Sequence, residues 1–342
     1  MNEKTYMRRE IEEIPQAVER LLSGSRESFI SAGAALREKD PSMVATIARG
    51  SSDHASAFLK YAIELTAGLP VASIGPSVMS IYGKELKLQR AAAIAISQSG
   101  KSPDIVAMAK SAHESGALTI AVTNTAGSPL TVASDFTIDL FSGTEKSVAA
   151  TKTFVSSVIA GLGVLGHWVD DKALLASIDG LPEVFAKAIE CDWSAFAEAL
   201  DGHQSLYVLG RGPSLAIASE AALKFKETCG IHAEAYSSAE VMHGPVRIVE
   251  EGYAILALAA RDAAEKSTAE MAHKLAGQGA LSYVTSDIPG AATRLPFAAT
   301  GHPITDALSL IVSFYGFVEA LSRRRGFNPD VPPNLKKVTE TI

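Results

Sequence analysis

The chain has 342 residues, a formal net charge of −7, 47% hydrophobic residues and 20% charged residues. This length predicts about two domains, and the composition is typical of a globular protein. The acidic balance without a Lys/Arg cluster argues against nucleic acid as a partner, and the two cysteines, Cys191 and Cys229, fit neither a disulfide framework nor a zinc site.

The first half of the chain is predicted to be an α/β domain. A helical N-terminal segment, 1–34, precedes this domain, which spans 35–168. Short apolar segments that alternate with helical ones predict a parallel sheet with helices on both faces. The five strands of this sheet are expected near residues 43–48, 70–74, 92–97, 118–123 and 136–140.

The longest apolar stretch, residues 155–169, bears on whether the chain enters a membrane. It is shorter than the ~20 residues that a spanning helix needs, and it carries His167. We therefore interpret it as a buried core helix. The N-terminus is charged and lacks the apolar core of a signal peptide, so the sequence predicts a cytoplasmic protein with no membrane partner.

The second half of the chain is predicted to be another α/β domain. Helices over 169–200 are expected to link it to the first, the domain spans 201–330, and a tail follows over 331–342. The five strands of its sheet are expected near residues 205–209, 231–236, 253–259, 280–285 and 295–299.

The two halves repeat each other at an offset of 162 residues. Arg49-Gly50-Ser51-Ser52 and Arg211-Gly212-Pro213-Ser214 each follow a strand-like run, and Gly68 and Gly230 occupy equivalent positions. Matches at several separated places indicate two copies of one domain. We therefore predict two tandem, doubly wound (flavodoxin-like) α/β domains, each with a five-stranded parallel sheet and helices on both faces.

The stretch 91–102, Ala-Ala-Ala-Ile-Ala-Ile-Ser-Gln-Ser-Gly-Lys-Ser, is the most informative local signal. A buried strand is predicted to stop at Ser97, and a hydroxyl-rich turn leads into a helix near Asp104. Backbone N–H groups, the helix dipole and hydroxyls at such a turn bind small anions. We therefore predict a phosphate on a small molecule as the ligand. The equivalent turn at 259–262 lacks hydroxyls, so the first copy is expected to hold the anion.

The second copy carries side chains that are able to move protons. Glu220, Lys224 and Glu227 are spaced i, i+4 and i+7 on a predicted helix, so they share one face. They form either a solvated stripe or the setting of a general base, Glu227. His243 precedes Gly-Pro at a turn, where it is either structural or a proton carrier near neutral pH.

Two further segments have both a structural and a functional interpretation. Thr151 and Thr153 either cap a helix or line the cleft. The tail lysines Lys336 and Lys337 are either solvated or folded over the cleft. In the cleft, a lysine could form a Schiff base with a ketose or stabilise a developing oxyanion.

The order of these motifs resembles the double sugar-isomerase (SIS) family, and most closely the isomerase half of glucosamine-6-phosphate synthases. The resemblance runs from about residue 30 to residue 342, and the ordered set is specific although no single motif is decisive. The motifs are Gly-Ser-Ser at 50–52, Ser-Gln-Ser-Gly at 97–100, Gly-Thr-Glu at 143–145, Ala-Leu-Lys-x-Lys-Glu at 222–227, Ile-His-Ala-Glu at 231–234, His-Gly-Pro at 243–245 and Asn-Leu-x-Lys at 334–337.

The resemblance assigns roles residue by residue. Glu227 matches the glutamate that moves a proton between sugar carbons 1 and 2, and Lys224 matches a lysine beside it. His243 matches the histidine that opens the sugar ring and comes from a neighbouring subunit, and Lys337 matches the tail lysine that forms an imine with the ketose. The implied phosphate-binding residues are Ser52, Ser97, Gln98, Ser99 and Ser102. The other implied cleft residues are Gly50, Ser51, Val148, Ala150 and Lys336.

The resemblance also implies a homodimer with the active site at its interface, and a reaction that needs no metal and no cofactor. Three departures from the synthase pattern are visible. Because the chain begins Met1-Asn2, we expect it to lack the glutaminase domain with its N-terminal cysteine. Arg49 stands where the synthases have cysteine, and Lys101 stands where they have glutamate.

A synthase without its ammonia source is expected to run in reverse. The implied activity is that of a glucosamine-6-phosphate deaminase, which converts glucosamine-6-phosphate and water to fructose-6-phosphate and ammonia. Four alternatives stay open: another phosphosugar aldose–ketose isomerase, a galactosamine-6-phosphate deaminase, a fructosamine-phosphate deglycase, and a sugar-phosphate sensor without turnover.

Overall fold

A computed structural model describes residues 4–337, which form two compact units. Of these residues, unit 1 takes 4–15, 146–151 and 180–335, and unit 2 takes 16–145, 152–179 and 336–337. These limits differ from the predicted segments, because residues 4–15 fold with the second half of the chain. Residues 1–3 of the predicted N-terminal segment and 338–342 of the predicted tail lie outside the described residues.

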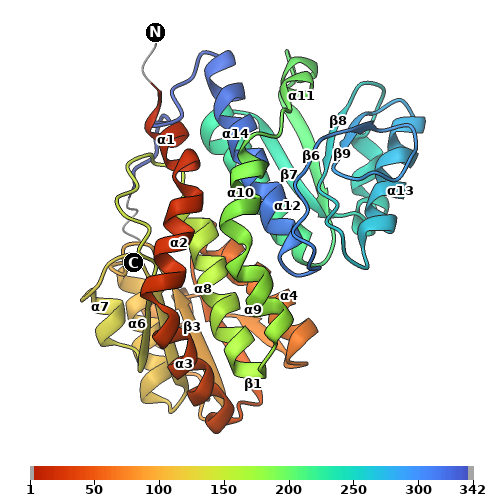
Figure 1. Cartoon of the computed structure of the whole chain (residues 1–342). Helices are drawn as coiled ribbons and strands as arrows, with labels where there is room; N and C mark the ends of the chain where they lie inside the picture. Colours follow the sequence, from red (N-terminus) through yellow and green to blue (C-terminus); the bar gives the residue numbers. More distant parts are fainter. Residues whose placement is uncertain (1–3, 338–342) are drawn as a thin grey trace. The chain divides into compact units, whose positions relative to one another are not determined.

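Unit 2 is built on a five-stranded parallel sheet in the order β2–β1–β3–β4–β5. Two of its strands, β1 and β3, are labelled in Figure 1. Its strands are β1 (Met43–Ile47), β2 (Val71–Ser73), β3 (Ala91–Ile96), β4 (Leu118–Thr123) and β5 (Phe136–Asp139). Its helices are α2 (Ile14–Gly24, which begins at the unit boundary), α3 (Arg26–Lys39), α4 (Ser51–Thr66), α5 (Ser77–Ser80), α6 (Pro103–Glu114), α7 (Pro129–Val132), α8 (Lys152–Val169) and α9 (Lys172–Asp179).

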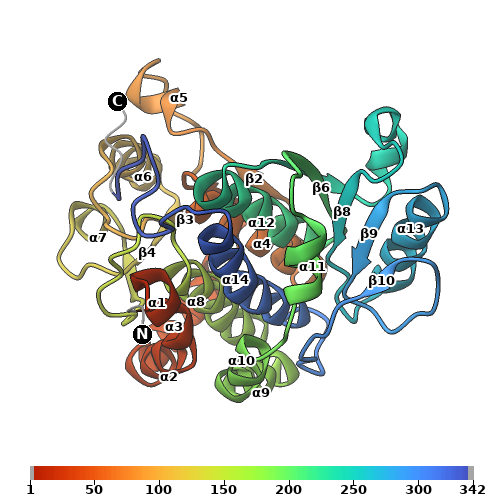
Figure 2. The ribbon, with the colours of Figure 1, turned by 90° about the horizontal axis from the view of Figure 1, so that it is seen from above.

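Helices cover both faces of this sheet, and the strand sequences reflect that burial. Every residue of β3 is buried, which is why the strand is a continuous run of Ala and Ile rather than an alternating one. Ala91, Ala93 and Ala95 of β3 share one core cluster with Ile105 and Met108 of α6. Figure 2 shows β3 and β4 between α6 and α7 on one side and α3 and α8 on the other.

Helix α8 is long and apolar enough to cross a membrane by length and composition, but 89% of it is buried inside the fold. It packs against α3 and α4. Gly161 and Gly163 permit these close contacts, since an added Cβ would meet Leu59 of α4 at 2.3 Å and Phe29 of α3 at 2.9 Å. The prediction of a buried core helix over 155–169 is confirmed.

Unit 1 contains a second five-stranded parallel sheet, in the order β10–β9–β8–β6–β7. Its strands are β6 (Ser205–Gly210), β7 (His232–Ser237), β8 (Ala254–Ala257), β9 (Leu281–Val284) and β10 (Thr293–Arg294). Its helices are α1 (Tyr6–Glu12), α10 (Leu181–Ile189), α11 (Ser194–Ala199), α12 (Pro213–Cys229), η1 (Glu240–Met242), η2 (Pro245–Ile248), α13 (Glu265–Gly277) and α14 (Asp306–Arg324). In Figure 2, β8 and β9 lie between α13 and the group of α11, α12 and α14.

The duplication predicted from the sequence is visible in the backbone. In each unit the first strand lies between the second and third, which is the flavodoxin-like order. Gly50 precedes α4 with φ 56° and ψ −132°, and Gly212 precedes α12 with φ 60° and ψ −137°. Equivalent residues 162 positions apart therefore adopt the same unusual backbone conformation. The prediction of two tandem α/β sheets is confirmed.

One strand was placed wrongly by sequence pattern. The fifth strand of the second copy was expected near 295–299, but β10 covers only Thr293–Arg294. Pro296 has no N–H for a ladder, and its carbonyl accepts a hydrogen bond from Trp193 Nε1 at 2.8 Å. The ring of Phe297 lies 3.6 Å from the Arg261 guanidinium instead of joining a sheet.

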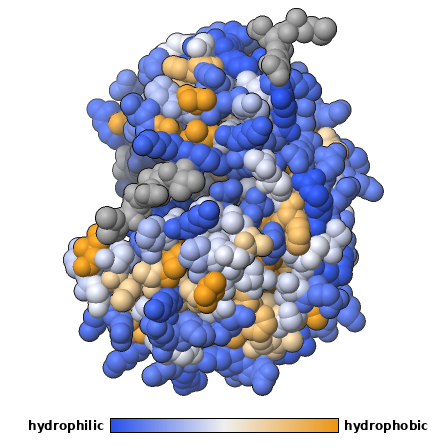
Figure 3. All heavy atoms as spheres, turned by 90° about the vertical axis from the view of Figure 1, so that its left-hand side faces the viewer, coloured by the Kyte–Doolittle hydropathy of each residue, from blue (hydrophilic) through white to orange (hydrophobic). Residues whose placement is uncertain are grey.

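The face drawn in Figure 3 is mainly hydrophilic, and its apolar side chains form small separate groups outside the grey atoms. Such scattered apolar side chains are ordinary on protein surfaces. The most exposed apolar residues of the described chain include Tyr82 and Val132, which are 78% and 83% exposed.

The two thiols are predicted to react slowly in the folded protein. Burial raises the pKa of the Cys229 thiol to about 11, and burial also raises the pKa of Cys191. Since the thiolate is the nucleophile, Ellman's reagent at pH 8 should leave Cys229 unmodified and label Cys191 slowly. The same protein in guanidinium chloride should react quickly at both positions. Fast native labelling that maps to Cys229 would contradict its burial.

Candidate functional site

The predicted anion-binding turn lies in unit 2 between β3 and α6. Within the turn, Gly100 N donates to Ser97 Oγ at 3.2 Å, and Lys101 N donates to Ser99 Oγ at 3.3 Å. Among residues 4–337, the N–H groups of Ser99 and Ser102 have no hydrogen-bond partner. The turn therefore offers backbone donors at the N-terminus of α6, where the helix dipole favours an anion. Nothing in the structure explains Lys101, which is exposed.

Gly100 is the residue on which this turn geometry depends. Its φ is +61°, and an added Cβ would lie 2.1 Å from Ser128 Oγ and 3.0 Å from Thr123 Oγ1. Its carbonyl accepts a hydrogen bond from Leu130 N at 3.1 Å, which ties the turn to α7. Both the left-handed backbone and the close approach require glycine here.

An ion pair brings a second helix N-terminus to this turn. Arg49 follows β1, and both its Nε and its Nη2 lie 2.7 Å from Asp104 Oδ2, on a fully buried carboxylate in the first turn of α6. Because β1 pairs directly with β3, the start of α4, with Gly50, Ser51 and Ser52, lies beside the start of α6. Sequence reasoning noted Arg49 in the repeated motif and as a departure from the synthases, but missed this ion pair.

A cavity of 570 Å³ opens at the carboxyl ends of β3, β4 and β5. Ligands of parallel α/β sheets bind at this edge. Gln98, a predicted phosphate-binding residue, lines the cavity together with Glu145. The other lining residues are Arg20, Asn124, Thr125, Asp139, Phe141, Gly143 and Thr144.

Glu145 organises the wall of this cavity, and sequence reasoning missed it. Its carboxylate is buried and accepts hydrogen bonds from Thr153 N at 3.1 Å and Thr153 Oγ1 at 2.7 Å, at the start of α8. Lys337 Nζ lies 2.7 Å from Glu145 Oε2. The tail lysine is thus paired rather than solvated, whereas Lys336 is exposed. The motif Gly-Thr-Glu at 143–145 was the only sequence signal for Glu145.

In unit 1, α12 carries a buried row of charges. Lys224 Nζ lies 3.2 Å from Glu220 Oε1 and 2.6 Å from Glu227 Oε2, and Tyr315 Oη donates to Glu220 Oε1 at 3.2 Å. The side chains of Glu220 and Lys224 are fully buried, while that of Glu227 is 21% exposed. The solvated-stripe interpretation is therefore wrong, and Glu227 is the accessible end of a buried Glu–Lys–Glu row.

The protonation of Lys224 follows from its neighbours. Burial alone would lower the pKa of the Lys224 ammonium, but the Coulombic attraction of Glu220 and Glu227 and their hydrogen bonds raise that pKa well above its ordinary value. Lys224 is therefore an ammonium at neutral pH. It compensates the buried carboxylate of Glu220 and holds Glu227 in place.

Residues at the two ends of α12 set the limits of the helix that carries this row. Pro213 occupies the first turn of α12 and Gly230 ends the helix in the left-handed conformation with φ 62°, as the helix-ending glycine predicted.

His243 follows η1 and is exposed; among the described residues its ring has no hydrogen-bond partner. Val148 and Ala150 lie half-buried in the irregular segment 146–151 of unit 1.

The turn of unit 1 that is equivalent to the anion-binding turn is occupied by the protein itself. Arg261 Nε lies 2.9 Å from Asp306 Oδ2, and Arg261 N donates to the same oxygen at 2.8 Å. Asp306 is buried. An internal ion pair thus stands where the first copy has hydroxyls; that the first copy holds the anion stays a prediction.

Comparison with known proteins adds to this geometry. The SIS domain family matches residues 39–163 and 200–289. Glutamine–fructose-6-phosphate aminotransferase (isomerizing) from Aeropyrum pernix is 32% identical over 349 residues, covering 97% of this chain and 56% of that protein. The chain thus spans about half the length of this curated relative.

Solved structures give the same fold. One is a Silicibacter pomeroyi protein that is provisionally assigned as a phosphosugar isomerase. It is 55% identical with a TM-score of 0.93, and the match covers 96% of this chain and 100% of that chain. Glucosamine-6-phosphate deaminase from Thermotoga maritima has a TM-score of 0.76 at 20% identity, covering 98% of this chain and 100% of that chain. The second likeness is one of fold alone.

Replacing Lys224 with methionine is predicted to destabilise unit 1. The change leaves the buried Glu220 carboxylate without its cation, which typically costs about 3–5 kcal/mol in the free energy of unfolding. Because the pKa of Lys224 is raised by folding, its contribution is complete at every pH below its ordinary pKa and is lost only as pH rises through the folded value. Urea unfolding at pH 7 therefore measures the full contribution of Lys224 to the free energy of unfolding.

The matched control is Lys266→Met, since Lys266 forms an exposed i,i+4 pair with Glu270 at 3.8 Å. Exposed pairs of this kind contribute little to stability. An equal loss of stability in the two variants would contradict the buried role of Lys224.

Gly100→Ala is predicted to weaken binding of inorganic phosphate, measured by calorimetry. The added Cβ collides with Ser128 and the residue must keep a positive φ, so the turn has to change shape. We expect the Kd to rise by about tenfold or more, equivalent to ~1.4 kcal/mol. Gly127→Ala is the control, because Gly127 has φ +67° but open space around its Cβ position. Equal effects of both variants would show that the Gly100 contact is irrelevant to anion binding.

Proposed function

This chain belongs to the SIS domain family, and from that premise we propose that it is an enzyme of phosphorylated sugars, specifically a glucosamine-6-phosphate deaminase. The observation that carries the proposal is the buried Glu220–Lys224–Glu227 row with only Glu227 accessible. A fully buried lysine between two carboxylates costs desolvation energy. Such an arrangement is expected where it positions a functional carboxylate.

In the proposed reaction, the turn from Ser97 to Ser102 holds the phosphate of the substrate. Its free backbone donors and hydroxyls suit a dianion, and Ser52 at the adjacent start of α4 adds another hydroxyl. The equivalent turn of the second copy is filled by Arg261 and Asp306. One phosphate per chain is therefore proposed.

Proton transfer is assigned to Glu227. After ring opening, for which we propose His243, the carboxylate takes the proton from C2 of the amino aldose and returns it to C1. The C1 oxygen also gains a proton and the amino nitrogen loses one, so the product of this step is a C1 alcohol with an imine at C2. Water adds to that carbon, the C–N bond breaks, and ammonia leaves with the proton it needs, which gives fructose-6-phosphate. Lys224 remains an ammonium throughout and holds the Glu227 side chain through a hydrogen bond of 2.6 Å.

The contacts of Lys337 favour one of its two proposed roles. An ammonium paired with Glu145 at 2.7 Å has no free electron pair, so imine formation would require it to leave Glu145 and lose a proton. As an ammonium, Lys337 could instead stabilise negative charge on a ketose oxygen. We propose the second role.

The test is ammonia release from glucosamine-6-phosphate by the purified protein, with fructose-6-phosphate measured as the second product. N-acetylglucosamine-6-phosphate is the negative control, because its blocked nitrogen cannot leave as ammonia. Galactosamine-6-phosphate tests the epimer. Binding of fructose-6-phosphate without ammonia release from any amino sugar would overturn the deaminase proposal.

Within that assay, Glu227→Gln should lower turnover by roughly 10²–10⁴-fold, the usual contribution of a positioned acid–base group. Glu270→Gln, an isosteric change on the exposed face of α13, should leave turnover unchanged. A Glu227→Gln enzyme within tenfold of the wild type would remove Glu227 from the proposed role.

A further inference from the structure

Helix α1 lies outside both segments matched by the SIS domain family, yet it binds the backbone of a predicted cleft segment. The Glu10 carboxylate is buried and accepts hydrogen bonds from the N–H groups of Lys146 and Ser147 and from Ser147 Oγ. All of these residues belong to unit 1. An irregular segment such as 146–151 has no ladder or helix to satisfy its N–H groups, so Glu10 supplies that acceptor.

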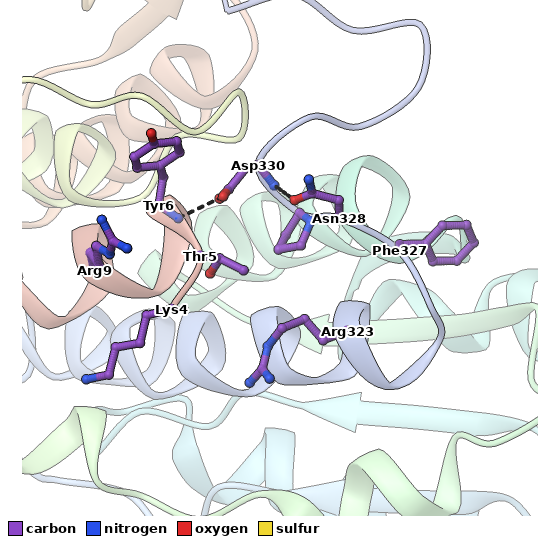
Figure 4. Close-up of a pocket in the computed structure, with 9 residues that line it drawn as sticks. Lys4, Thr5, Tyr6, Arg9, Arg323, Phe327, Asn328 and Asp330 are labelled. Carbon is purple, nitrogen blue, oxygen red and sulfur yellow. Dashed lines mark hydrogen bonds between the residues drawn. The ribbon is translucent and has the colours of Figure 1, made fainter. Parts of the chain in front are cut away.

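Asp330 makes the complementary contact from the other end of the chain. Its carboxylate accepts hydrogen bonds from Tyr6 N at 2.8 Å and Met7 N at 2.7 Å, which lie at the first turn of α1. Its carbonyl oxygen accepts from Val148 N at 3.2 Å. Figure 4 shows Asp330 facing Tyr6, with its own N–H bound to Asn328 Oδ1 at 3.0 Å. One residue thus fixes α1, Val148 and the chain that leads into the tail.

The N-terminus of α1 is itself firmly attached. Thr5 Oγ1 donates to Glu319 Oε1 at 2.8 Å, and the same buried carboxylate pairs with Arg323 Nε at 2.8 Å on α14. Thr5 Oγ1 also accepts from Arg8 N at 3.0 Å and so caps α1. Contacts with α14 therefore fix the position of α1, which carries Glu10 and to which Asp330 binds.

We propose that Glu10 and Asp330 are positioning residues that hold segment 146–150 and the start of the tail in the shape that turnover requires. The inference rests on the proposed function, because the resemblance places Val148, Ala150 and Lys337 among the residues that meet the substrate. Neither carboxylate needs to touch the substrate. Each acts through the backbone that it binds, and small displacements of such a segment cost rate.

Glu10→Gln is the most selective variant. Glutamine has the same shape as glutamate, but it has one acceptor oxygen, whereas both carboxylate oxygens of Glu10 accept hydrogen bonds. Glu12→Gln is its control, because Glu12 lies on the same helix and, within residues 4–337, its ion pairs are with Lys4 and Arg8 near the surface. Asp330→Asn tests the second contact. Each full-length variant is assayed for kcat and KM, and hydrogen–deuterium exchange is followed for a peptide that covers residues 145–151.

We expect Glu10→Gln and Asp330→Asn to lower kcat by about 10- to 100-fold while KM changes by less than about threefold. Exchange of the 145–151 peptide should become faster, with the peptides of α12 and β6 unchanged. Glu12→Gln should behave as the wild type in both measurements.

Two results would overturn the inference. Unchanged exchange of segment 145–151 would show that the carboxylates do not hold it, and faster exchange with unchanged kcat would show that its order is irrelevant to turnover. If the wild type releases no ammonia from any amino sugar, the proposed function fails separately. The exchange data then still decide whether Glu10 and Asp330 hold the segment.

Discussion

Burial of the central strands of both parallel sheets on both faces is the constraint on which the rest of the structure depends. Strands such as β3 consist of small and aliphatic residues throughout, because helices cover both of their faces. Polar side chains of these sheets then gather at the turns that follow the strand ends. In unit 2 these turns bring the starts of α4 and α6 together through Arg49 and Asp104, and they frame the cavity lined by Gln98 and Glu145.

Buried carboxylates fix the positions of several segments of the chain. Glu220, Glu145, Glu10, Asp104 and Asp306 are all buried, and each is bound to a cation or to backbone N–H groups. An unpaired buried charge would cost several kcal/mol or lose its charge. Each carboxylate therefore fixes the geometry of the groups around it, whether these are a lysine, a helix start or an irregular segment.

The two copies show how one scaffold acquires two different roles. Gly50 and Gly212 keep the same backbone conformation, so the turn that starts the first helix of each copy is preserved. The turns after β3 and β8 have diverged: one presents hydroxyls and free N–H groups, and the other contains the Arg261–Asp306 pair. The second copy differs also in its first helix: α12 carries a buried row of charges, whereas no charged residue of its counterpart α4 is buried.

Local pattern in the sequence was sufficient for the two sheets, nine of the strand positions, the core helix α8 and the helix-ending Gly230, because these depend on residues near one another in the chain. The short strand β10 was misplaced since its limits depend on Trp193 and Arg261, far from it in sequence. The burial of Glu220 and Lys224, the Glu145–Lys337 pair and the contacts of Glu10 and Asp330 were decided only by tertiary structure. The spacing of residues along one helix or along the tail does not specify which groups surround these side chains. The free energy of burying a charge depends on those surrounding groups, so the sequence pattern could not predict it.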